Sequence, residues 1–259
     1  MGASDLAGTG VLVTRPAHQA DRLVRLIEEA GGRAIRFPVI EIAEPIDNAL
    51  LLAIVDRLER FDLAIFISPN AVEKAMNLVR ARRRGWPENV TVACVGRGSA
   101  RALRHFGMEH AITPAGRFDS EALLAEPALA DIHGKRIVIF RGDGGRELLG
   151  NTLRERGADV EYAECYRRVR PAVDPTPLLR RWARGEIDIV TVTSVDALRN
   201  LYDMVGKAGR SWLVRTPLVV LAESHAEACR ELGFKHAPIV AREASDEAIL
   251  EAIQAWRAG

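Results

Sequence analysis

The sequence predicts an α/β protein of two doubly wound domains, each a parallel sheet of flavodoxin-like size with helices on both faces. Three observations predict this fold class. Short apolar runs alternate with amphipathic segments, the amphipathic segments end at glycine, and the whole pattern occurs twice along the chain. A chain of 259 residues is long enough for two such domains and for a sizeable buried core.

Ten apolar runs are the predicted strands, and the segments between them are the predicted helices. In "AHQADRLVRLIEEAGG" the apolar residues recur at i, i+3, i+4 and i+7, and the segment stops at glycine, as in a C-capped amphipathic helix. Strands that alternate with helices in this way form a parallel sheet. The predicted strands cover residues 10–14, 34–38, 63–67, 91–95 and 110–113, then 136–140, 160–165, 187–193, 217–221 and 236–240.

The two halves of the chain are related by one fixed offset of 126 residues. The strand "VLVTR" (11–15) falls on "IVIFR" (137–141), and the later matches keep the same offset without gaps. Chance matches would drift in register, so the halves are predicted to be structural copies. The matched positions include Gly31 with Gly157, Ser68 with Ser194, Ala71 with Ala197, Gly107 with Gly233, and Glu121 with Glu247.

The charge balance argues against a nucleic-acid or membrane partner. The formal net charge is +1, whereas such partners usually require a clustered basic excess. Only four of the 36 basic residues are lysines. This arginine excess reflects either a bias of the genome or recognition of carboxylates and phosphates, which guanidinium groups bind through two parallel hydrogen bonds.

The cysteines and the N-terminus favour a cytoplasmic protein. Cys94, Cys165 and Cys229 are odd in number and widely spaced, so no disulfide framework is expected. The first residues, "MGASDLAGTG", contain neither the charged nor the apolar region of a signal peptide. No apolar run approaches the roughly 20 residues of a membrane-spanning helix.

The candidate ligand site lies where the strands end. In open α/β sheets ligands bind outside the carboxyl ends of the strands, near the point where the strand order reverses. Those ends read "TRPAHQ", "SPN", "GRGSA", "RGDGGRE", "TSVD" and "AESHA", and most place a small hydroxyl or a glycine directly before a helix. The free amides and the dipole at a helix start form a general anion site.

Simpler explanations exist for these corners. Ser68, Ser99, Ser194 and Ser224 could each be only a helix N-cap, worth about 0.5–2 kcal/mol, and His225 could be a polar surface residue. No nucleotide or metal site is predicted. "GRGSAR" lacks the third glycine of a dinucleotide fingerprint, "GDGGRE" lacks a P-loop lysine, and the six histidines show no ligand spacing.

Four stretches carry a resemblance to a known family: "VLVTRPAHQADRLVRLIEEAGGRAIRFPVIEI", "FDLAIFISPNAVEKAM", "VACVGRGSARAL" and "CYRRV". Their order and spacing resemble those of uroporphyrinogen-III synthases over nearly the whole chain. The resemblance implies two α/β domains joined by a two-stranded β ladder. It places residues 1–36 with 171–259 in one domain, residues 42–163 in the other, and residues 37–41 and 164–170 in the ladder.

The resemblance also implies an activity. Members of this family are lyases of tetrapyrrole (haem) biosynthesis that need no metal or organic cofactor. They close hydroxymethylbilane, an open-chain tetrapyrrole with eight carboxylates, while inverting its last ring, ring D, and releasing water. The protein is accordingly expected to be a cytoplasmic monomer whose partner is this small-molecule substrate.

Tyr166 in "CYRRV" matches the family's cleft tyrosine and is the candidate catalytic residue, with a role in hydroxyl departure. Its alternative role is packing between the domains. The alternative function for the whole chain is a non-catalytic two-domain module that binds an anionic small molecule. That alternative explains the paired domains and the anion corners equally well, but it does not predict a tyrosine on the ladder.

The resemblance also assigns substrate contacts, with Ser68 and Ser194 expected to hold one polyanionic chain from two sides. His225 departs from the family, which usually has threonine there, so a role that requires a hydroxyl is in doubt at this position. The predicted substrate contacts are Arg15, Ser68, Asn70, Ser99, Gly142, Arg146, Ser194, Ser224 and His225.

Overall fold

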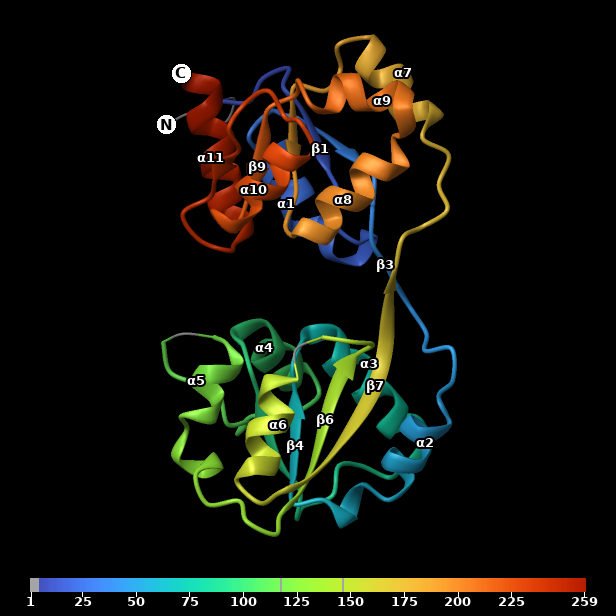
Figure 1. Cartoon of the computed structure of the whole chain (residues 1–259), viewed down its shortest axis with the longest axis vertical. Coiled ribbons are helices and arrows are strands. Elements are labelled where there is room, and N and C mark those ends of the chain that lie inside the picture. The colour runs from blue at the N-terminus through green and yellow to red at the C-terminus, as the bar shows by residue number, and fades with distance from the viewer. Residues whose placement is uncertain (1–4, 117, 146) are drawn as a thin grey trace. The chain divides into compact units, whose positions relative to one another are not determined.

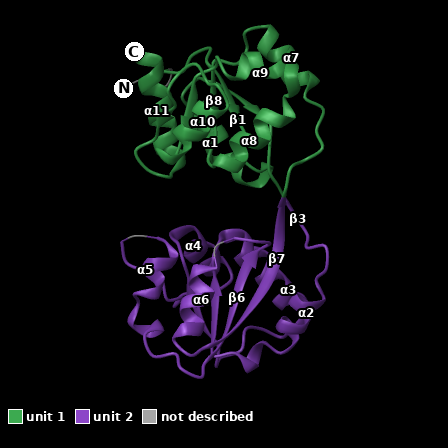
Figure 2. Cartoon of the chain, in the orientation of Figure 1, with its two compact units in different colours: residues 1–41, 169–259 green, residues 42–168 purple. Residues whose placement is uncertain are grey.

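The computed structural model describes residues 5–116, 118–145 and 147–259. The chain forms two compact units, residues 1–41 with 169–259 (unit 1) and residues 42–168 (unit 2), as Figure 2 shows. Each unit contains one five-stranded sheet. Within the described residues, no helix has both the length and the apolar character needed to cross a membrane.

Unit 1 has the strand order β10-β9-β8-β1-β2, and its described strand pairs are parallel. Helices α1 and α11 pack on one face of the sheet, and α7, α8, α9 and α10 pack on the other (Figure 1). The strands are β1 (Gly10–Val13), β2 (Arg33–Arg36), β8 (Ile189–Thr191), β9 (Leu218–Val220) and β10 (Ile239–Val240). The helices are α1 (Ala17–Glu29), α7 (Thr176–Ala183), α8 (Val195–Met204), α9 (Gly206–Leu213), α10 (Ser224–Glu231) and α11 (Asp246–Ala258).

Unit 2 has the strand order β3-β7-β6-β4-β5. Helices α2, α3 and α4 pack on one face, and α5 and α6 pack on the other (Figure 1). The strands are β3 (Glu41–Ala43), β4 (Leu63–Phe66), β5 (Thr91–Cys94), β6 (Arg136–Gly142) and β7 (Asp159–Val169). The helices are α2 (Ala49–Asp56), α3 (Pro69–Arg82), α4 (Arg97–His105), α5 (Ser120–Leu124) and α6 (Leu148–Glu155), with single 3-10 turns at Leu58–Arg60 and Pro127–Leu129.

The central strands are apolar at every position because both of their faces are buried. In β4, Leu63 and Ile65 pack in the cluster beneath α5 and α6, whereas Ala64 and Phe66 pack in the cluster beneath α2 and α3. Successive side chains of a strand point to opposite faces, so a strand covered on both sides reads as a continuous apolar run. The apolar runs of the sequence therefore predicted these strands correctly.

The two sheets share a central topology, and each takes its strands from both halves of the chain. In unit 1 the first two strands, β1 and β2, come from the first half, and the next three come from the second half. In unit 2 the equivalent first two strands, β6 and β7, come from the second half, and β4 and β5 come from the first. When the strands of unit 1 are numbered 1 to 5 as β1, β2, β8, β9 and β10, their order in the sheet is the flavodoxin-like order 2-1-3-4-5. When β6, β7, β4 and β5 of unit 2 are numbered 1 to 4 in the same way, their order is 2-1-3-4.

Some predicted strands differ from the observed ones. The stretch 110–113 contributes only an isolated bridge between Ala93 and Ile112. Residues 37–40 form no strand. On the side of β7 away from β6, the neighbouring strand is β3, which begins at Glu41. The physical reason is that the Phe37 and Val39 amides donate back to Val13 and Thr14, while the intervening proline has no N–H to donate.

Helix capping is duplicated with the same offset as the strands. Ser68 and Ser194 each accept a hydrogen bond from the amide three residues later, at 3.1 Å. Asp119 and Ser245, also 126 residues apart in the sequence, cap α5 and α11 in the same way. The cap explanation is wrong for Ser99 and Ser224, because Gly96 and Glu223 occupy the N-cap positions of α4 and α10.

Replacing Ser194 by alanine is expected to lower the free energy of unfolding by about 1 kcal/mol, because the amide of Ala197 loses its acceptor. Ser224→Ala is the matched control, since that serine makes no capping bond, and it should change the free energy by less than about 0.5 kcal/mol. Urea unfolding of both variants measures the difference. Equal losses would contradict the cap assignment.

Candidate functional site

The candidate site of unit 2 lies at the carboxyl ends of β4 and β6, where the strand order reverses. β6 pairs with β7 on one side and with β4 on the other, so this pair is the topological switch point at which α/β sheets bind ligands. Ser68 lies two residues after the end of β4, at the N-cap of α3, and Gly142 is the last residue of β6. Three predicted site residues, Ser68, Gly142 and Tyr166, meet there.

A hydrogen bond joins the side chains of Ser68 and Tyr166. The two hydroxyl oxygens are 3.0 Å apart, and the Ser68 hydroxyl also accepts the amide hydrogen of Ala71. Tyr166 is only 2 % exposed, whereas Ser68 is half-buried. Within unit 2 Tyr166 is therefore buried, and Ser68 is the more exposed residue of the pair.

Two further predicted residues lie in the first turns of neighbouring helices. Asn70 in α3 is 8 % exposed and Ser99 in α4 is 2 % exposed. Helices α3 and α4 pack against each other on the same face of the sheet. No side chain caps α4, so amides of its first turn are available to an anion.

Arg141, the residue before Gly142 in β6, belongs to this candidate site although the sequence did not predict it. It is 3 % exposed, and its guanidinium pairs with Glu147 at 3.0 Å and donates to the carbonyl oxygen of Gly144. It also stacks over the Tyr162 ring at 4.6 Å. Arg141 thereby holds the glycine loop that follows β6. The predicted contact Arg146 lies outside the described residues.

The carboxylate of Glu147 connects this loop to β7. Its oxygens accept the Tyr162 hydroxyl at 2.7 Å and the Arg141 guanidinium at 3.0 Å. These two hydrogen bonds, the tyrosine bond first, lower the pKa of Glu147 below its ordinary value. The pKa of Tyr162 is raised, chiefly by burial and then by the same hydrogen bond.

The carboxyl edge of unit 1 has the equivalent corners with different side chains. The Thr14 hydroxyl donates to the Thr191 carbonyl at 2.7 Å, and the Thr191 hydroxyl donates to the Leu12 carbonyl at 3.1 Å. These two hydrogen bonds join the carboxyl ends of β1 and β8. Arg15, the predicted carboxylate contact, forms an ion pair with Asp246 at the start of α11. Its guanidinium is thus partly neutralised within the unit.

His225 lies in the first turn of α10, at the position that Ser99 has in unit 2. Its Nδ1 is buried and has no hydrogen-bond partner among the described residues. Burial lowers the pKa of His225, so the ring is neutral at neutral pH. A neutral imidazole can donate or accept one hydrogen bond, but it adds no charge to hold a carboxylate.

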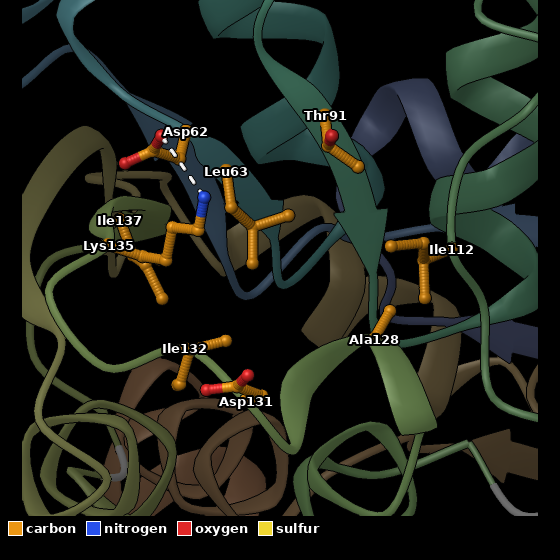
Figure 3. Close-up of a pocket in the computed structure, with 9 residues that line it drawn as sticks. All are labelled: Asp62, Leu63, Thr91, Ile112, Ala128, Asp131, Ile132, Lys135 and Ile137. Atoms are coloured by element: carbon orange, nitrogen blue, oxygen red, sulfur yellow. Dashed lines mark ion pairs between the residues drawn. The ribbon is translucent and has the colours of Figure 1, made fainter.

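A cavity at the opposite edge of the unit 2 sheet has a different character. Its volume is about 170 Å³, and it lies at the amino ends of β4, β5 and β6 (Figure 3). The Lys135 ammonium and the Asp62 carboxylate, 3.7 Å apart, lie beside an apolar lining that includes Leu63, Ile132 and Ile137. It contains none of the predicted site residues. Within the described parts of the chain, no cluster of three or more His, Cys, Asp or Glu side chains is arranged to hold a metal ion.

Comparison with known proteins identifies the family. The family model described as uroporphyrinogen-III synthase HemD matches residues 21–251. The chain belongs to this family. The uroporphyrinogen-III synthase of Escherichia coli K12 is 36 % identical over 245 residues, which is 94 % of this chain and 99 % of that protein. The synthase of Salmonella typhimurium LT2 has the same identity and coverage.

A solved structure of this family shares the fold. The crystal structure of a mutant uroporphyrinogen III synthase from the extremely thermophilic bacterium Thermus thermophilus superposes with a TM-score of 0.62 at 23 % identity. The match covers 96 % of this chain and 98 % of that one. Both units therefore have counterparts in a uroporphyrinogen-III synthase of known structure.

Acid is expected to weaken the loop that Glu147 holds. Because its folded pKa is lowered, this carboxylate contributes stability above its unfolded pKa of about 4.3 and loses it as the pH falls through the lowered folded value. Between pH 6 and pH 3, the wild-type free energy of unfolding should fall more than that of Glu147→Gln. Urea unfolding across this range tests it, with the exposed Glu109→Gln as control. Identical pH curves for wild type and Glu147→Gln would contradict the assignment.

Proposed function

We propose that this chain closes hydroxymethylbilane to uroporphyrinogen III, inverting ring D and releasing one water. The observation that carries the proposal is the family match, which extends over residues 21–251. The non-catalytic binding module is the less favoured alternative, since the relatives at 36 % identity are named as synthases. We further propose that the protein acts as a monomer in the cytoplasm and uses no cofactor.

The substrate carboxylates would bind at the helix starts along the carboxyl edges of the sheets. Among the described residues neither α4 nor α10 has a side-chain cap. The first-turn amides of α4 can therefore donate to carboxylate oxygens, and the helix dipole favours the negative charge. In α10 the amides of His225 and Ala226 already donate to the carbonyls of Ala222 and Glu223, so the Ser224 amide is the one this turn can offer. Ser99 and His225 lie in those same first turns. These features support the proposed binding of a polycarboxylate at both units.

We assign Tyr166 and Ser68 a joint role in loss of water. The carbon–oxygen bond of the substrate hydroxymethyl group breaks, the departing hydroxyl takes a proton, and a pyrrole carbon then attacks the cation that remains, giving a spiro intermediate. Because Ser68 is the more accessible of the two, its hydroxyl would donate to the departing oxygen while the phenol donates to Ser68. At their 3.0 Å separation either hydroxyl can donate, so this order is compatible with the hydrogen bond between them.

The required rate effect is modest, because the enzyme competes with spontaneous closure to the isomer without inversion. A preference of about 2.7 kcal/mol for the inverting transition state already gives a hundredfold excess. Holding a flexible chain in a folded conformation can supply several kcal/mol through orientation alone. A positioned proton donor contributes roughly 10²–10⁴-fold more.

The expected product of purified protein and freshly made hydroxymethylbilane is the type III isomer, because the proposed site closes the chain with ring D inverted. Oxidation to porphyrins followed by chromatographic separation of the isomers measures this. A reaction without protein is the control and should give type I. Finding only type I product with the protein present would refute the proposed activity.

Tyr166→Phe is expected to lower the rate of type III formation by about a hundredfold, because the proton donor is lost. Ser68→Ala should cause a loss of similar size. Ser194→Ala is its matched control, since both serines cap a helix at 3.1 Å but only Ser68 contacts Tyr166, and it should change the rate mildly. Tyr202→Phe controls for the loss of a phenol. A wild-type rate in Tyr166→Phe would remove this tyrosine from the mechanism.

A further inference from the structure

Two tyrosines of β7, Tyr162 and Tyr166, lie on opposite faces of the sheet although they are four positions apart. In a regular strand, residues i and i+4 share a face. Tyr162 packs with the cluster beneath α5 and α6 and donates to Glu147. Tyr166 packs with the cluster beneath α2 and α3 and pairs with Ser68. Something between them must reverse the alternation.

The reversal comes from one extra residue in β7. Along the pairing with β6, Arg141 lies opposite Glu164, but the next residue, Gly142, lies opposite Tyr166. Cys165 therefore has no partner residue in β6, which defines a one-residue bulge. Ala163 and Cys165 keep their expected face, and Tyr166 then joins them in the same buried cluster. Bulges of this kind re-aim a side chain next to active sites.

Gly142 provides the space into which the ring turns. A β-carbon added at Gly142 would lie 2.7 Å from Cε2 and 2.8 Å from Cζ of Tyr166, closer than real contacts allow. The φ angle of Gly142 is not positive, so the backbone conformation itself would accept alanine. The obstacle to alanine at this position is the contact with the Tyr166 ring. The end of the bulge is fastened by the Asp143 amide, which donates to the Tyr166 carbonyl at 2.8 Å.

We propose that the bulge at Cys165 and the missing side chain of Gly142 together position the Tyr166 hydroxyl on Ser68. Gly142 is then a positioning residue for Tyr166. The importance of this arrangement for catalysis rests on the proposed role of Tyr166. The geometry itself can be tested independently of that role.

The test uses the three tyrosines of the chain as probes. Protein labelled with carbon-13 at tyrosine Cζ gives three NMR signals, which single Tyr→Phe variants assign. Ser68→Ala should move the Tyr166 signal and leave that of Tyr162, whereas Glu147→Gln should do the reverse. Gly142→Ala should move the Tyr166 signal, and Gly85→Ala, which has no neighbouring atom within 4 Å, should move none.

The same variants are then assayed for type III formation. Gly142→Ala is expected to reduce it by about a hundredfold, as a displaced catalytic group does. In a Tyr166→Phe background it should cause no further loss, because no hydroxyl remains to be displaced. A urea unfolding midpoint for each variant checks that it is folded.

Two results would overturn the inference: an unmoved Tyr166 signal in folded Gly142→Ala, or a Ser68→Ala change that moves Tyr162. The serine and glutamate variants keep the test decisive if Gly142→Ala does not fold. Failure of the proposed activity would show as type I product only, and failure of the proposed role of Tyr166 looks different again. In that case Tyr166→Phe would form type III product at the wild-type rate while the NMR signals still moved as expected.

Discussion

Both units depend on pairing between central strands that lie far apart in the sequence. In unit 1, Val11 of β1 lies opposite Ile189 of β8, and in unit 2, Leu63 of β4 lies opposite Ile137 of β6. These pairs join the two halves of the duplication in the middle of each sheet. The carboxyl ends of the same pairs carry the candidate site residues, so neither half of the chain can build a site alone.

The fold was largely predictable, because apolar runs and glycine stops depend on local sequence. The site was predictable only in part. The offset that aligns Arg15 with Arg141 could have revealed the buried arginine, since both follow matched strands. The bulge at Cys165 could not have been found, because a single unpaired residue leaves no pattern in one sequence. The burial of Tyr166 follows from that bulge, and so it was missed as well.

The two copies differ at the ends of their first two strands. At the positions equivalent to Gly142 and Tyr166, the first half has Pro16 and Ile40. Unit 1 therefore has no counterpart of the tyrosine–serine pair, although its serine cap is retained. Both copies keep the scaffold and the serine caps, which contribute to stability in both units, whereas the hydrogen-bonded tyrosine–serine pair occurs in unit 2.

The discontinuous composition of unit 1 sets an order of folding during synthesis. Unit 2 is complete once residue 168 has left the ribosome, but β1 and β2 cannot gain their neighbour β8 until residues 189–191 emerge. At roughly 5–20 residues per second, the finished β2 waits about 8–30 s for that strand. Throughout this interval the apolar face of α1, with Leu23 and Ile27, has no core to enter. The nascent chain is therefore most vulnerable to aggregation at its N-terminal segment, which still lacks its partner strand when unit 2 is already complete.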